Sequence, residues 1–161
     1  MLKPISLVLC IFFAFSACEK DDFCTTETLT PKLILRFYDS SNPTELKAVE
    51  NLSVWATDKD TLASYTSVTT DSIAIPLNTS STSTEYHFKM NNTTGNSADN
   101  LYNQLTITYT LEDIYISRSC GFVSNFHNLS IDGETNWIQT ISPTTGLTIT
   151  NETAAHVQIH H

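Results

Sequence analysis

The cysteines are the most chemically reactive residues of this chain. The sequence holds four of them: Cys10, Cys18, Cys24 and Cys120. A thiol can be acylated, oxidised to a disulfide, used as a metal ligand or used in redox exchange. Redox exchange of the thioredoxin type is disfavoured, because no two cysteines stand in C-x-x-C spacing. The stretch FSACEKDDFC, which contains Cys18 and Cys24, therefore raises the question of whether its two thiols are partners.

The segment before Cys18 has the features of an export signal. Lys3 and the amino terminus give it a positive start, and an apolar run follows from Ile5 to Phe15. That run is about eleven residues long, whereas a helix that spans a bilayer needs roughly twenty. We therefore expect residues 1–17 to form a cleaved signal peptide that carries Cys10 away with it.

The residues around the expected cleavage site resemble the lipobox of bacterial lipoproteins. In Phe15-Ser16-Ala17-Cys18, small residues precede a cysteine, although Phe15 stands where that pattern usually has Leu. The resemblance implies that the signal is cut before Cys18, that the Cys18 sulfur is diacylated and that its new amine is acylated too. Two or three acyl chains anchor a protein stably where one does not. The alternative is an ordinary signal peptide cut after Ala17, with Cys18 free for a disulfide.

The residues after Cys18 carry a second resemblance. Glu19-Lys20-Asp21-Asp22 is similar to the acidic export signal of Bacteroidetes lipoproteins, which implies an outer-membrane protein exposed on the cell surface. The alternative is a solvated tether on a lipoprotein that faces the periplasm. In both cases we expect residues 18–30 to form a lipidated acidic tether.

Cys24 and Cys120 remain once Cys10 and Cys18 are assigned. In an exported compartment such a pair usually forms a disulfide. The bridge would close a loop of nearly one hundred residues and stabilise the fold by at most about 4 to 5 kcal/mol in the chain-entropy description. The alternative is a pair of free, buried thiols.

The elements that must position these cysteines are β-strands. From Pro31 onward apolar residues recur at every second position, most clearly in LTITYTL at 105–111, and no window has the helical spacing. Similar runs occur at 33–37, 52–56, 73–77, 86–90, 114–118, 122–126, 137–141, 147–149 and 157–159. Pro76 suggests an edge position or a strand end. We therefore expect residues 31–161 to form a single antiparallel β-sandwich, immunoglobulin-like or a similar Greek key, of about eight to ten short strands.

Three short motifs extend the resemblance over nearly all of the mature chain. They are an opening strand TPKLILRFYD (Thr30 to Asp39), the tripeptide CGF (Cys120 to Phe122) and a terminal AHVQI. Together with the lipobox cysteine they resemble a family of small Bacteroidetes lipoproteins of unknown function. The resemblance implies an exported all-β domain and supplies no catalytic residue and no ligand.

Several classes of function are disfavoured by the composition. The formal net charge of −9 and the isoelectric point near 4.7 argue against nucleic acid, which is bound largely through Lys and Arg. There is no G-x-S-x-G nucleophile motif, and four glycines are too few for a phosphate-binding loop. His156, His160 and His161 could bind a transition metal adventitiously, although a solvated last strand explains them as well. We expect no catalytic residue, no cofactor and no metal.

Binding is the function that remains. Trp55 should lie on the opposite side of its sheet from Leu52 and Val54, and Trp137 stands near a strand start. Exposed aromatics among polar residues are typical of sugar-binding surfaces, although burial at a sandwich edge is the alternative for each. We expect a non-catalytic, lipid-anchored protein of the cell envelope that acts as a structural or accessory partner of another envelope protein. The alternative is a surface glycan-binding module that uses Trp55 or Trp137.

Overall fold

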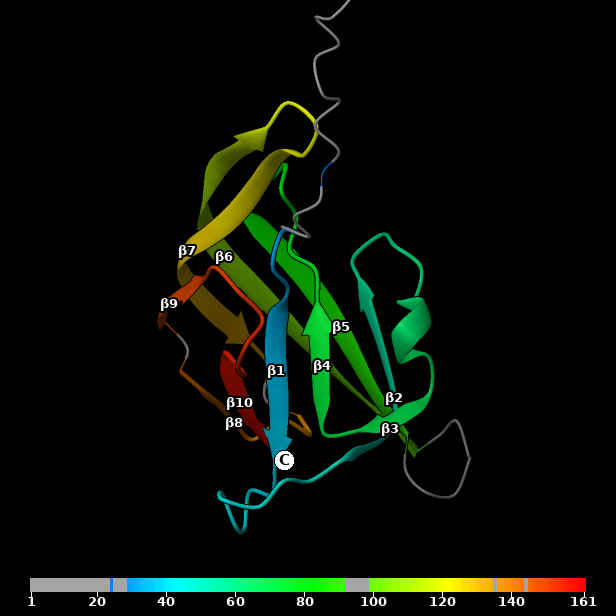
Figure 1. The fold of residues 1–161 in the computed structure, drawn as a ribbon. Helices are drawn as coiled ribbons and strands as arrows, with labels where there is room; N and C mark the ends of the chain where they lie inside the picture. The colour runs from blue at the N-terminus through cyan, green and yellow to red at the C-terminus, as the bar shows by residue number, and fades with distance from the viewer. Residues whose placement is uncertain (1–23, 25–28, 92–98, 135, 144) are drawn as a thin grey trace, which may run out of the picture.

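The computed structural model describes Cys24 and residues 29–91, 99–134, 136–143 and 145–161 of the chain. The expected signal peptide over 1–17 lies outside these residues, as does most of the expected tether. The described part is built almost wholly of strands, and the prediction of an all-β sandwich is confirmed (Figure 1). Its elements are β1 (Leu33–Tyr38), β2 (Val49–Ala56), the 3-10 turn η1 (Ala63–Tyr65), β3 (Val68–Thr70), β4 (Ser72–Ile75), β5 (Ser83–Asn91), β6 (Asn100–Ser117), β7 (Gly121–Gly133), β8 (Thr140–Ser142), β9 (Thr145–Ile149) and β10 (Val157–His160).

The strands form two sheets that pack face to face. One has the order β4-β1-β10-β8 and the other the order β3-β2-β5-β6-β7-β9. The pair of β1 and β10 is parallel, which departs from the expected antiparallel arrangement, and the other strand pairs are antiparallel. Parallel neighbours need a long connection between them. Here that connection is the rest of the domain, because β1 and β10 are its first and last strands.

The alternation predicted from the sequence builds the core between the sheets. Leu33, Leu35 and Phe37 of β1 are fully buried, while the residues between them are partly exposed. Leu105 and Ile107 of β6 come from the facing sheet and join the same cluster. Period-two burial of this kind removes one face of each strand from water and is the main source of stability for such a fold.

The β6–β7 hairpin is longer than the sequence predicted. Separate strands were expected at 105–111 and 114–118, but β6 is continuous over 18 residues. The acidic residues between the two runs do not end the strand, because they have partners on β7. Asp113 Oδ1 accepts a hydrogen bond from Ser124 Oγ at 2.6 Å, and Glu112 Oε2 accepts one from His127 Nε2 at 2.8 Å. As a result the hairpin extends past the end of the four-stranded sheet (Figure 1).

Two tyrosines fix the connection between β4 and β5. β4 is an edge strand and ends immediately before Pro76, as the proline suggested. The hydroxyl of Tyr86 donates to the carbonyl of Pro76 at 2.5 Å, and that of Tyr109 donates to the carbonyl of Asn78 at 2.8 Å. Burial raises the pKa of Tyr86 to about 12, so its hydroxyl stays protonated as a donor. These two hydroxyls therefore attach the start of the polar segment at Asn78 to the core.

Candidate functional site

A disulfide joins the start of the domain to the end of the long hairpin. Cys24 and Cys120 are bridged, with their Cα atoms 5.0 Å apart and a separation of 96 positions in the sequence. Cys120 belongs to the turn between β6 and β7, and the next residue, Gly121, has φ +70°. Few residues other than glycine adopt that conformation at low cost. The predicted pairing of these two cysteines is thus present, while Cys18 lies outside the described residues.

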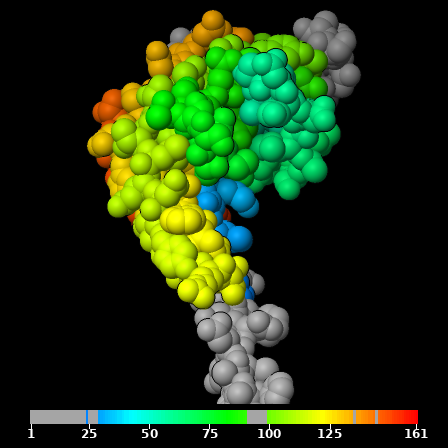
Figure 2. Space-filling view, turned by 90° about the horizontal axis from the view of Figure 1, so that it is seen from above, coloured from blue at the N-terminus to red at the C-terminus, as the bar shows by residue number. Residues whose placement is uncertain are grey.

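The hairpin end exposes apolar side chains. We call Ile114–Val123 the hairpin tip. Tyr115 and Phe122 are 55% and 67% exposed, and their rings meet edge-on with centroids 5.3 Å apart. Ile114 is exposed as well. In Figure 2 the yellow hairpin tip projects from the body of the molecule, next to the blue start of the domain.

The hairpin tip also lines an apolar groove. Ile114 and Val123 oppose each other in register, and Tyr115 and Phe122 form the next pair along the ladder. Successive pairs point to opposite faces of a hairpin, so both faces of the hairpin tip are apolar. The groove has a volume of about 490 Å³ and is lined by Leu29, Pro31, Ile114, Ile116, Val123, Asn125, Thr150, Asn151 and Glu152. The sequence predicted strands at these positions, but it did not predict this exposed surface. The one indication in the sequence was that apolar residues stand at consecutive positions, and so on both faces of each strand.

Trp55 lies where the sequence predicted, on the outer face of the six-stranded sheet. It is half-buried, and its ring stacks on that of His87, its partner on β5, with centroids 5.5 Å apart and planes 17° from parallel. His87 Nε2 donates to Thr57 Oγ1 at 2.9 Å and lies 3.6 Å from Glu85 Oε1. The Thr57 hydroxyl in turn donates to Glu85 Oε1. These contacts fix the imidazole ring under the indole.

A polar hollow lies beside this stacked pair. In register, Gln104 of β6 opposes His87, and Thr106 opposes Glu85 on one side and Asp132 on the other. The hollow has a volume of about 300 Å³ and is lined by Gln104, Thr106, Asp132, Gly133 and Glu134. The outer face of this sheet therefore combines an aromatic platform with amide, hydroxyl and carboxylate groups. We call this surface the Trp55 face.

Of the two alternatives for Trp137, burial is the one found, and a role as an exposed binding residue is excluded. Its side chain is 6% exposed and packs in the core, with ring centroids 6.3 Å from Phe37 and 5.6 Å from His161. The reason is Asn103, a buried polar residue on the inner face of β6. Asn103 Oδ1 accepts hydrogen bonds from the backbone N–H groups of Trp137 and Ile138 at 3.0 and 3.2 Å. Its amide nitrogen also donates to the carbonyl of Glu134. The amide thus holds this segment over the core.

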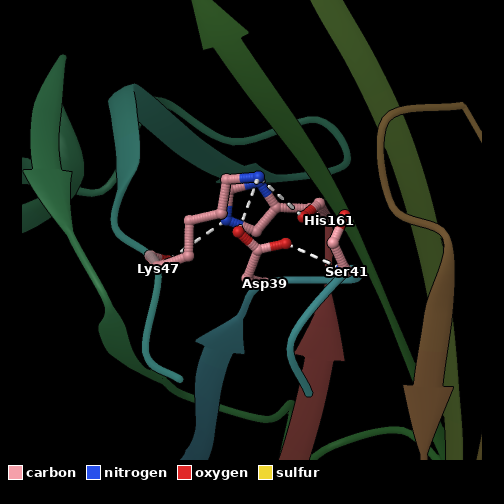
Figure 3. Close-up of polar contacts among 4 residues, drawn as sticks. All are labelled: Asp39, Ser41, Lys47 and His161. Carbon is pink, nitrogen blue, oxygen red and sulfur yellow. Dashed lines mark hydrogen bonds and ion pairs between the residues drawn. The ribbon is translucent and has the colours of Figure 1, made fainter. Parts of the chain in front are cut away.

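The opposite end of the sandwich is closed by polar contacts (Figure 3). Lys47 Nζ donates to the main-chain oxygen of His161 at 3.0 Å and lies 3.8 Å from Asp39 Oδ2. His161 Nε2 donates to the carbonyl of Lys47 at 3.1 Å. A hydrogen bond from the Ser41 N–H lowers the pKa of Asp39, and burial lowers the pKa of His161. Each group is used to attach the 39–47 loop to the ends of β1 and β10.

His156, expected on a solvated strand, has a structural role. The ring Nδ1 of His156 accepts a hydrogen bond from the backbone N–H of Ile34 at 2.9 Å. The backbone N–H of His156 donates to the carbonyl of Ile34, also at 2.9 Å. Its Nε2 donates to the carbonyl of Asn151. Burial lowers the pKa of His156, which keeps the accepting nitrogen unprotonated. Within the described residues no three His, Cys, Asp or Glu side chains gather in a group that could hold a metal ion.

Comparisons with known proteins give the family of the chain. Among the described residues, no helix has the length and apolar character needed to cross a membrane. No curated protein and no solved structure gives a significant match to the chain. A family model does match, over residues 51–161, which include most of β2 and every later element together with Cys120. The chain therefore belongs to DUF6452, a family of unknown function.

Proposed function

We propose that the protein is a non-catalytic, lipid-anchored binding protein of the cell envelope, held at the outer membrane by acyl chains on Cys18 and exposed at the cell surface. The observation that carries this proposal is the position of the disulfide. Cys24 is fixed to the hairpin tip, and six residue steps separate it from Cys18. Such a segment spans at most about 20 Å when fully extended. Lipid on Cys18 would therefore keep this one end of the sandwich next to the membrane.

The anchor is tested by replacing Cys18 in the full chain expressed in its native host. The Cys18→Ala protein is expected to lose acylation and to stay unprocessed or leave the membrane fraction. Cys10→Ala is the matched control, because it removes a thiol of the same N-terminal segment and leaves both the lipobox and the Cys24–Cys120 disulfide intact. Membrane fractionation that Cys18→Ala does not change would contradict the proposal, as would an N-terminal peptide whose mass shows no acyl chain.

The Trp55 face supports a second proposal, that the protein binds a glycan. An aromatic ring offers an apolar surface to the C–H groups of a sugar, while neighbouring amide and carboxylate groups accept and donate hydrogen bonds to its hydroxyls. Trp55 stacked on His87 supplies the ring, and the hollow lined by Gln104 and Asp132 supplies the polar groups. With the hairpin tip toward the membrane, the Trp55 face lies along the side of the sandwich and stays open to solution.

A glycan array tests the second proposal, which the first does not require. The wild type is expected to bind a defined set of glycans and Trp55→Ala to lose at least about tenfold in affinity, which corresponds to about 1.4 kcal/mol. Tyr115→Ala is the matched control, since it removes an exposed aromatic away from the Trp55 face. No glycan binding by the wild type would remove the second proposal and leave the first intact.

A further inference from the structure

We propose that the hairpin tip sits in the headgroup layer of the membrane, with Tyr115 and Phe122 among the lipid headgroups. The inference deepens the proposed lipid anchoring of Cys18 and rests on it. It assigns a second membrane contact, made by the folded domain itself.

The exposed side chains of the hairpin tip suit a membrane interface. Tyr115 and Phe122 are more than half exposed although they face each other on one sheet. Aromatic side chains, tyrosine in particular, concentrate where apolar and aqueous layers meet, because the ring is apolar and the hydroxyl can reach water. Ile114, on the other face of the hairpin, is exposed too. A hairpin apolar on both faces is costly in water and is explained by a surrounding layer of lipid.

The tether keeps the hairpin tip within reach of the membrane. The Cα atoms of Cys24 and Cys120 are 5.0 Å apart, so the short segment from Cys18 ends directly at the hairpin tip. Fully extended, this segment spans about 20 Å. The headgroup layer on each side of the hydrocarbon core is roughly 5 to 8 Å thick. The segment can therefore cross the headgroup layer and a few layers of water, but it reaches no further. Leu29, the first described residue after Cys24, is 78% exposed and adds apolar surface at the same end, where it lines the groove with Ile114.

The charge of the hairpin tip agrees with a lipid partner. In a chain of net charge −9, the ten residues IYISRSCGFV contain no acidic residue and one basic residue, Arg118. The nearest carboxylates along the chain, Glu112 and Asp113, are engaged by His127 and Ser124. The carboxylate of Glu152, which lines the groove, accepts a hydrogen bond from the Lys32 N–H. Lipid phosphates would repel most of this protein, but at the hairpin tip they meet a single cation. At the far end the 39–47 loop carries Asp39, Glu45 and Lys47 and has no such excess.

The inference is tested by depth-dependent quenching in vesicles. The acylated full-length protein is reconstituted into phosphatidylcholine and phosphatidylethanolamine vesicles whose acyl chains carry bromine near the headgroups. Phe122→Trp reports the hairpin tip, and Thr44→Trp, at an exposed position of the 39–47 loop, is the matched control. Emission of Trp55 and Trp137 is subtracted with the parent protein. If Phe122→Trp does not fold, Tyr115→Trp replaces it.

The expected result is the loss of most of the emission added at position 122 and little loss at position 44. Co-flotation with the vesicles without quenching at 122 overturns the inference and leaves the anchor standing. Equal quenching at both positions overturns it as well. Shielding of position 122 from aqueous iodide without bromine quenching indicates a protein cover, such as a second copy of the chain, and also overturns it. A protein that does not co-float removes the anchor and the inference together.

Discussion

The two ends of the sandwich solve the same problem in opposite ways. Both must finish a stack of two sheets whose inner faces are apolar. At the end shown in Figure 3, Asp39, Lys47 and His161 cover the core with ion-pair and hydrogen-bond contacts, and His161 packs edge-on against Trp137. At the hairpin tip, Tyr115 and Phe122 stay in the open. The first arrangement serves stability in water, whereas the second leaves apolar surface exposed.

The difference also separates two kinds of constraint. The polar end is held by many weak contacts, among them the amide of Asn103 and the imidazole of His161, and each is satisfied within the domain. At the hairpin end the covalent bond between Cys24 and Cys120 is added to the hydrogen bonds that Asp113 and Glu112 accept from β7. Breaking single contacts at each end therefore tests whether the two ends are built for different purposes.

The largest effect on stability is expected from removing the disulfide. The Cys24→Ser, Cys120→Ser double variant frees a long loop in the unfolded state and should lower the free energy of unfolding by about 4 kcal/mol. Urea denaturation of the soluble domain measures this value, with the reduced wild type as the matched comparison. A loss of less than about 1 kcal/mol would show that the hairpin end is held by other contacts.

The next largest loss of stability is expected from removing the buried amide of Asn103. Asn103→Ala leaves two N–H groups and one carbonyl without this partner, so the free energy of unfolding should fall by about 3 kcal/mol. Gln104→Ala, the next residue on the opposite face of β6, is the control and should change it by less than about 0.5 kcal/mol. If the two variants prove equally stable, the 134–138 segment is not held by Asn103.

A smaller, pH-dependent effect is expected from half-buried His156 and buried His161. The pKa values of His156 and His161 are lowered by burial, so below pH about 6.5 the unfolded chain takes up protons that the folded chain does not. Stability should therefore be full above that pH and fall as the pH decreases toward 5. Thermal unfolding across this range measures the slope, and His156→Gln should make it shallower. An unchanged slope in this variant would contradict the structural role of His156.

The smallest effect on stability is expected at the hairpin tip. Tyr115→Ser with Phe122→Ser should change the free energy of unfolding of the soluble domain by only about 0.5 kcal/mol, because both side chains are already exposed. Urea denaturation alongside Asn103→Ala gives the comparison directly. A loss as large as that of Asn103→Ala would mean that these rings stabilise the fold rather than serve a surface.

The alternation of residues such as Leu33 with Leu35 and Leu105 with Ile107 was enough to predict a sandwich, since burial of one strand face is a local property of the sequence. The parallel pairing of β1 with β10 could not be predicted from the sequence, because it depends on where the first and last strands of the domain meet in space. The choice between burial and exposure of Trp137 could not be made from the sequence for a related reason. Its burial depends on an amide 34 positions earlier, and Asn103 lay just before the run from which the strand was predicted. The exposed pair of Tyr115 and Phe122 likewise required the length of β6 to be known.

Covalent footprinting of the native, membrane-bound protein tests the central contrast most directly. Hydroxyl-radical labelling of Tyr115 and Phe122 at the hairpin tip is compared with that of Leu46 in the opposite 39–47 loop, first in membranes and then after detergent extraction. The account predicts strong protection of Tyr115 and Phe122 in membranes, equal labelling of Leu46 in both states, and loss of the protection in detergent. Equal labelling of the two ends in membranes, or protection of Leu46 alone, would contradict it.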